Sequence, residues 1–114
     1  MRIGPEQAIQ IAVCEFCALH RIPFIHIANE RKTSYVQGAL LKRMGVVRGA
    51  SDCFMPRGNT LHKGLFLELK TTKGKPTLFQ ISFLEKMRKE GYMGLVAYGL
   101  DQALDHIKNF YSLK

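Results

Sequence analysis

The sequence contains no apolar run that approaches the roughly 20 residues of a membrane-spanning helix, and its amino terminus lacks the apolar core of a signal peptide. Its three cysteines are an odd number and define no disulfide framework. It contains no internal repeat, low-complexity segment or linker. These absences exclude a membrane-spanning protein and a small secreted domain held together by disulfides. We expect a soluble, intracellular protein in a reducing compartment.

Acidic residues are also scarce. Nine Asp and Glu stand against 17 Lys and Arg, which gives a net charge of +8 and a pI near 9.7. This balance favours a polyanionic partner, although charge alone does not separate DNA from RNA or from an anionic membrane surface. The 114 residues, with a mass of 12.9 kDa, predict one domain over residues 1–114 that buries roughly two-thirds of its unfolded surface.

Cys14, Cys17 and His20 have a spacing that could suggest a zinc or redox site. A structural zinc ion takes four ligands, and no second ligand pair follows. Both cysteines are therefore expected on or beside the buried stripe of the first helix. The histidines show no metal-ligand spacing along the chain: His20, His26, His62 and His106.

Apolar periodicity predicts an α/β fold with the element order αβαββαβα, which describes a mixed sheet flanked by helices. Helices are expected over about 5–20, 36–44, 77–90 and 100–111, and strands over 24–28, 51–55, 65–70 and 93–98. The last strand is apolar on both faces, as expected of a central strand. The segment 57–64 is rich in turn formers, so the strands that flank it are expected to form an antiparallel hairpin.

The hairpin carries charges in an unusual place. In residues 65–70 the three leucines point to one face, while Glu68 and Lys70 share the other. A packed strand seldom carries two charged groups unless they satisfy each other or serve chemistry. Asp52, near the start of the preceding strand, is expected to lie close to both. Two carboxylates and an ammonium then converge at an open strand end, and such hard oxygen ligands suit Mg²⁺ or Mn²⁺ better than zinc.

Asp52 followed by Glu68-Leu69-Lys70 after a hairpin resembles the Asp…Glu-x-Lys core of the PD-(D/E)xK nucleases. The chain also resembles, more narrowly, the virus-type replication-repair nuclease (VRR-NUC) domain, and the likeness runs in order through nearly the whole chain. Four blocks carry it: Gly45 to Asp52, Gly64 to Lys70, Gly74-Lys75-Pro76 with Gln80, and Gly91-Tyr92. The resemblance implies a restriction-endonuclease-like fold and metal-dependent cleavage of DNA. Ser51 stands where the superfamily name expects proline, a departure that removes no ligand.

On this resemblance, Asp52 and Glu68 are expected to bind the metal ion, with the backbone carbonyl of Leu69 as a third ligand. Mg²⁺ binds a few protein oxygens and keeps waters for chemistry. Lys70 is expected to orient or help deprotonate the attacking water and to stabilise developing negative charge. The alternative is a surface ion pair between Glu68 and Lys70 on an edge strand, which contributes at most about 1 kcal/mol.

Glu6 and Gln80 match positions at which the family carries an active-site glutamate and glutamine. Glu6 shares a helical stripe with Ile9 and Val13, so it is expected to point toward the sheet as a metal or water ligand. Its alternative role is a first-turn acid that complements the helix macrodipole. Gln80 shares a stripe with Leu84 and is expected to turn inward near Lys70, the alternative being a buried amide that bonds the loop backbone.

Loops at strand ends border such a site, so basic residues there are expected to contact phosphates. These DNA-binding candidates are Arg31, Lys32, Arg48, Lys73 and Lys75. In contrast, Lys86, Arg88 and Lys89 are expected to form an ordinary solvated helix face.

These observations together predict an Mg²⁺- or Mn²⁺-dependent DNA endonuclease. A small domain offers one active site, whereas resolving a four-way junction requires two nicks related by symmetry, so we expect a homodimer that acts on branched DNA. Freestanding chains of this size resemble phage-encoded, junction-cleaving dimers of the family, which act in the host cytoplasm.

The alternatives are a monomer that nicks duplexes weakly, a non-catalytic nucleic-acid-binding domain of the same fold, and an RNA-binding or structural domain of another class. The last predicts exposed aromatic platforms, yet Phe and Tyr fall mostly on buried stripes.

Overall fold

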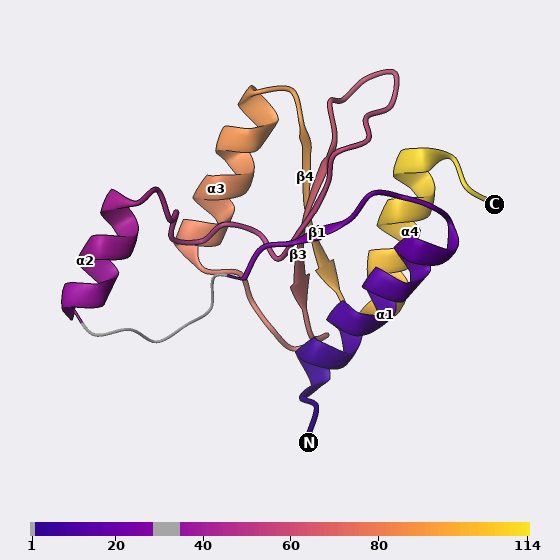
Figure 1. Cartoon of the computed structure of the whole chain (residues 1–114). Helices are drawn as coiled ribbons and strands as arrows, with labels where there is room; N and C mark the ends of the chain where they lie inside the picture. Colours follow the sequence, from indigo (N-terminus) through magenta and orange to yellow (C-terminus); the bar gives the residue numbers. More distant parts are fainter. Residues whose placement is uncertain (1, 29–34) are drawn as a thin grey trace.

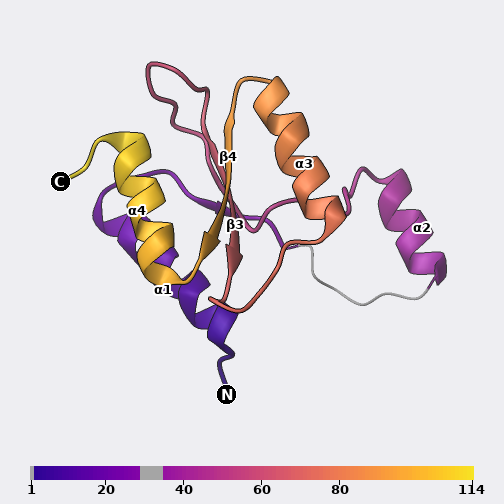
Figure 2. The same cartoon turned by 180° about the vertical axis from the view of Figure 1, so that it is seen from behind.

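The computed structural model describes residues 2–28 and 35–114. In these ranges the helices are α1 (Pro5–Leu19), α2 (Tyr35–Arg43), α3 (Leu78–Lys89) and α4 (Leu100–Tyr111). The strands are β1 (Ile25–His26), β2 (Cys53–Met55), β3 (Leu65–Lys70) and β4 (Met93–Tyr98). The predicted order αβαββαβα is therefore confirmed. Figures 1 and 2 show α1 and α4 on one face of the sheet, α3 on the other, and α2 farther out beyond α3.

The strands form a mixed sheet in the order β1-β2-β3-β4. The first three strands run antiparallel to their neighbours, whereas β4 runs parallel to β3. The predicted hairpin is confirmed, and its register aligns Cys53 with Leu67. From Leu65 to Leu69, β3 is buried on both faces, and only Lys70 at its end is half-buried. The two charged residues of the hairpin therefore sit on the most enclosed strand of the sheet.

The prediction that residues 93–98 form a central strand is wrong, because in the described residues β4 pairs with β3 alone and lies at the sheet edge. Its apolar character has another cause, since α3 and α4 pack against it from both sides (Figure 1). Three side chains contact the backbone polar groups along its free edge. Arg88 donates to the Gly94 carbonyl, and Gln102 accepts from the Tyr98 N–H. His106 Nε2 lies 3.1 Å from the Val96 carbonyl oxygen. This protects the edge from pairing with another chain. The expectation that Arg88 only forms part of a solvated helix face is therefore wrong, because its guanidinium binds the backbone of β4.

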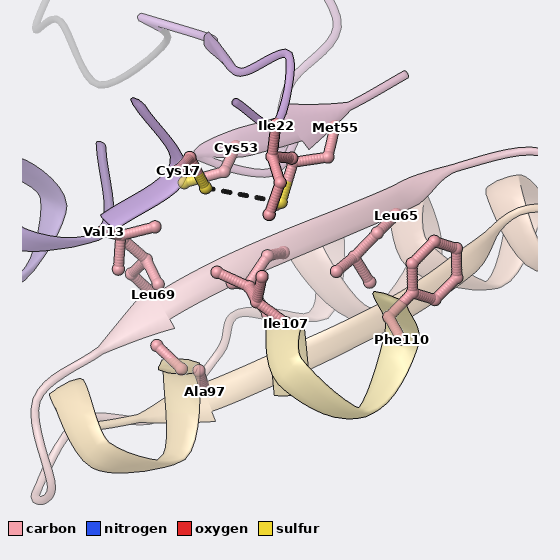
Figure 3. Close-up of a cluster of buried hydrophobic side chains, with 12 residues drawn as sticks. Val13, Cys17, Ile22, Cys53, Met55, Leu65, Leu69, Ala97, Ile107 and Phe110 are labelled. Atoms are coloured by element: carbon pink, nitrogen blue, oxygen red, sulfur yellow. Dashed lines mark hydrogen bonds between the residues drawn. The ribbon is translucent and has the colours of Figure 1, made fainter. Parts of the chain in front are cut away.

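The main core lies between the sheet and the pair of helices α1 and α4 (Figure 3). Cys17 of α1 is fully buried there, with its Sγ 4.0 Å from Met55 Sδ. Burial raises the pKa of the Cys17 thiol to about 11, which keeps it protonated at neutral pH. Cys14 is exposed, so the expected burial applies to Cys17 and not to its neighbour one turn earlier.

Gly49 allows the loop before β2 to touch the first turn of α3. Its φ is +85°, and a Cβ at this position would lie 2.5 Å from the Phe79 carbonyl oxygen and 2.8 Å from the Gln80 backbone nitrogen. Any other residue would have to push the loop and the helix apart. The start of α3 is therefore held against the segment that leads into Asp52.

We expect Gly49→Ala to destabilise the protein by about 1–3 kcal/mol more than Gly45→Ala, because of this collision. Gly45 is a matched control, since its φ is +99° but nothing lies within 4 Å of its would-be Cβ. The control should therefore lose only the backbone-strain energy, about 1–2 kcal/mol. Urea unfolding of both variants measures the difference, and equal losses would show that the contact with α3 is unimportant.

Candidate active site

Glu68 is a carboxylate buried at the end of β3, with only 1% of its surface exposed. Its Oε2 accepts a hydrogen bond from Gln80 Nε2 at 3.0 Å and lies 3.4 Å from Lys70 Nζ. Its Oε1 is buried and has no hydrogen-bond partner among the residues that the structure describes. A buried oxygen of this kind is costly unless another group satisfies it, and a cation is one such group.

Asp52 lies beside Glu68 because of the hairpin register. Cys53 pairs with Leu67, so one residue farther along the hairpin Asp52 comes opposite Glu68. The Leu69 N–H donates a hydrogen bond to Asp52 Oδ2 at 2.8 Å. The structure thus brings together the two carboxylates and Lys70, and it shows the Leu69 N–H, not the carbonyl implied by the resemblance, in contact with Asp52.

The backbone around Asp52 is fixed from two sides. The Asp52 carbonyl accepts a hydrogen bond from the Ile27 N–H at 2.8 Å, and His26 Nδ1 lies 3.0 Å from the same oxygen. Ser51, which stands where the superfamily name expects proline, is fully buried, and its hydroxyl donates to the Cys53 carbonyl at 3.3 Å. Packing and hydrogen bonds therefore restrain this segment without a proline ring.

Burial raises the pKa of Glu68 to about 8, and the nearby Asp52 carboxylate acts in the same direction, while the Lys70 ammonium opposes them. In the site without metal, Glu68 therefore keeps a proton to higher pH than an exposed glutamate does. Within residues 2–28 and 35–114, no three His, Cys, Asp or Glu side chains form a metal-binding group. Two carboxylates with an unsatisfied oxygen nevertheless fit a hard divalent cation such as Mg²⁺ or Mn²⁺, which keeps several of its waters.

Gln80 reaches Glu68 because of the way in which α3 begins. Thr77 caps the helix, with its Oγ1 accepting from the Gln80 N–H at 3.1 Å. The Gln80 Oε1 accepts from the Thr77 N–H at 2.8 Å, which leaves its Nε2 to donate to Glu68. The Gln80 side chain therefore bonds the loop backbone and also turns toward the carboxylate near Lys70, which are the two alternatives that the sequence left open. Thr77 was not singled out from the sequence, although Thr-x-x-Gln at a helix start is the signal of a capping box.

Glu6 is exposed in the first turn of α1. Along the stripe that these residues share, burial increases from the exposed Glu6 through the half-buried Ile9 to the fully buried Val13. The amino-terminal end of α1 lies toward the same end of the sheet as the carboxyl ends of β3 and β4 (Figures 1 and 2). The described structure does not, however, bring Glu6 into one acidic group with Asp52 and Glu68.

A cavity of about 1290 Å³ opens beside these residues and is lined by parts of α2, α3 and the loop before β2. Asp52 and Gln80 form part of its wall together with Lys42, Arg48 and Phe79. Lys42 and Phe79 were not predicted, because a basic residue in a last helical turn and an aromatic residue in a first turn carry no distinctive signal. Among the other predicted phosphate contacts, Lys73 and Lys75 are exposed in the loop after β3, and Arg31 and Lys32 lie outside the described residues.

No protein-family model matches the chain, and a search of curated proteins also finds no match. A search of solved structures finds a VRR_NUC domain protein with a TM-score of 0.82 and 24% sequence identity, over 99% of this chain and 93% of that chain. The chain has the VRR-NUC fold. The restriction-endonuclease-like arrangement implied by the sequence resemblance is thereby confirmed. In this VRR-NUC fold, no described helix has the length and apolar character that crossing a membrane requires.

The raised pKa of Glu68 predicts how the stability of the metal-free protein depends on pH. The native state keeps a proton that the unfolded chain loses near pH 4.5, so the free energy of unfolding should fall as the pH rises from there to about 8. Glu68→Gln removes this titration while preserving the shape of the neutral acid. Urea unfolding in EDTA at several pH values should therefore give a flatter profile for the variant. Identical profiles would contradict the assigned protonation.

Proposed function

We propose that this protein is a divalent-metal-dependent nuclease that hydrolyses phosphodiester bonds in DNA. The observation that carries the proposal is the gathering of Asp52, Glu68, Lys70 and Gln80 at one end of the hairpin of a VRR-NUC fold. These are the residues that the sequence resemblance also selects. The net charge of +8 supports a polyanionic substrate.

Asp52 and Glu68 would hold Mg²⁺ or Mn²⁺, with the carbonyl oxygen of Leu69 as a further ligand. When bound, such an ion lowers the pKa of a water molecule and neutralises charge on the phosphate in the transition state. Gln80 and Lys70 both contact Glu68 Oε2, so they fix the carboxylate and leave Oε1 for the cation. Glu6 would add a carboxylate from the start of α1.

Lys70 has a second role in this mechanism. Its ammonium lies at the half-buried end of β3, beyond the buried carboxylate that it contacts. From there it can orient the attacking water and stabilise negative charge that develops on the phosphate. The basic residues Lys42, Arg48, Lys73 and Lys75 would hold neighbouring phosphates and so position the strand.

We also propose that the active form is a homodimer that prefers branched DNA, and α2 supports this. In the described ranges α2 packs against no other helix or strand. Val36 and Leu40 of α2 and Met44, which directly follows it, recur every four residues, with 75%, 52% and 70% of their surfaces exposed. Helices shorter than about 12–15 residues are marginal in isolation, and a polyanion does not cover an apolar stripe. The same stripe on a second copy of the protein would cover this apolar surface. That copy would also supply a second active site.

We expect Asp52→Asn, Glu68→Gln and Lys70→Ala each to lower the cleavage rate by about 100-fold or more, because each removes a group that acts on the reacting water or phosphate. DNA binding should change little. Lys86→Ala, in the exposed part of α3, is the control and should cut normally. Labelled DNA incubated with purified protein in Mg²⁺, Mn²⁺, Ca²⁺ or EDTA measures both properties.

Ca²⁺ is expected to support binding but little cleavage, since its loose coordination positions the water poorly. Wild-type rates in Glu68→Gln or Lys70→Ala, with contaminating nuclease excluded, would refute the site. DNA binding without cleavage in any metal would instead support the non-catalytic alternative.

Leu40→Glu should convert the dimer into a monomer, because it places a charge in the middle of the apolar stripe. The control is Leu61→Glu, which makes the same change at an exposed leucine in the loop between β2 and β3, far from α2 in Figures 1 and 2. Light scattering at micromolar concentration reports the mass, and cleavage of four-way junctions is compared with that of matched linear duplexes. A monomeric wild-type protein with no preference for junctions would rule out this part of the proposal and leave the nuclease assignment intact.

A further inference from the structure

Among the arginines that the structure describes, Arg48 is the one whose guanidinium stacks on an aromatic ring. Its guanidinium carbon lies 4.0 Å from the centroid of the Phe79 ring. The guanidinium of Arg57 donates to the Arg21 carbonyl, and that of Arg88 donates to the Gly94 carbonyl. Arg48 makes no such hydrogen bond and no ion pair within the described ranges. Its N–H groups are therefore available to a ligand.

Phe79 is a half-exposed aromatic side chain, with 49% of its surface accessible, in the first turn of α3. A ring in this position covers little apolar surface of its own protein, so ordinary core packing does not account for it. Stacking of an arginine on an aromatic face holds the planar guanidinium while its edge can still donate hydrogen bonds. Phe79 thus reduces the freedom of Arg48 without using its donors.

Both residues belong to the wall of the cavity that Asp52 and Gln80 also line. Phe79 directly precedes Gln80, which contacts Glu68, and Arg48 directly precedes Gly49, whose backbone touches Phe79 and Gln80. The stacked pair and the carboxylate Asp52 line the same cavity. The contact that fixes the start of α3 therefore also sets where the guanidinium stands relative to the carboxylates.

We propose that the Arg48 guanidinium, held in a fixed orientation, binds the phosphate next to the one being cut through two parallel hydrogen bonds. Phe79 is then the positioning residue that holds this guanidinium. Planar bidentate recognition of phosphate is the task for which arginine is suited and lysine is not. The inference rests on the proposed nuclease function, and it adds a role for Phe79 and a reason why residue 48 is arginine.

The test is a double-mutant cycle on DNA affinity, measured in Ca²⁺ with the same junction or duplex for every variant. Phe79→Leu should weaken binding by about two- to fivefold, the value of an exposed cation–π contact, and Arg48→Ala should weaken it by at least as much. The double variant should bind no worse than Arg48→Ala, because Phe79 acts only through Arg48. Phe79→Tyr, which keeps the ring face, should restore wild-type affinity. Arg48→Lys should resemble Arg48→Ala in affinity while keeping the wild-type salt dependence.

Additive losses in the double variant, full affinity in Phe79→Leu, or a failure of Phe79→Tyr to rescue would each overturn the inference. Lys89→Ala, which removes a charge from the last turn of α3, controls for the loss of general positive charge. Thermal unfolding of each variant separates a folding defect from a binding defect. Cleavage by the wild-type protein in Mg²⁺ is measured separately. Absence of cleavage would argue against the nuclease function, whereas the binding data alone test the role of Arg48 and Phe79.

Discussion

The burial of one carboxylate, Glu68, is the constraint on which the site depends. A charge on the most enclosed strand of the sheet is unfavourable unless nearby groups compensate for it. Lys70 and Gln80 provide that compensation at one oxygen, and the other oxygen is left without a partner among the described residues. Burial and Asp52 keep the pKa of Glu68 high, so in the proposed mechanism the binding of a metal ion would displace a proton from it. Such a perturbed pKa in a buried cluster is typical of functional sites, which is consistent with the proposed nuclease.

The rest of the fold serves to hold the groups that surround Glu68. The antiparallel register of β2 and β3 puts Asp52 opposite it, and the capping box of α3 aims the Gln80 amide at it. Gly49 joins these two supports, because only a glycine lets the loop before β2 lie against the first turn of α3. The core between the sheet, α1 and α4 lies on the other face of the sheet from α3 and includes Cys53 and Leu69, the chain neighbours of Asp52 and Glu68 (Figure 3). A VRR_NUC domain protein with 24% sequence identity has the same fold, so much of the sequence can change while the fold persists.

The side of the molecule that carries α2 has a different character. There, apolar residues are exposed and a large cavity separates the helix from α3, in contrast to the close packing of α1 and α4 on the opposite face. Basic and aromatic groups, Arg48 and Phe79 among them, gather on the wall of that cavity close to the carboxylates. The compact half of the protein therefore holds the main buried core, and the proposed contacts with a substrate and with a second copy lie on the open half.

The sequence by itself determined the order of the elements, the span of β3, β4 and α4, and the meeting of Asp52, Glu68 and Lys70. Each of these follows from a local periodicity or from a hairpin, whose pairing partners are close along the chain. Tertiary structure decided the rest. The edge position of β4 depends on which strands lie beside it, and two covering helices make an edge strand as apolar as a central one. The exposure of Glu6 depends on how far α1 overlaps the sheet. The pairing of Arg48 with Phe79 joins residues 31 positions apart (79 − 48) across a contact that only Gly49 permits, and no pattern along the chain encodes such a contact.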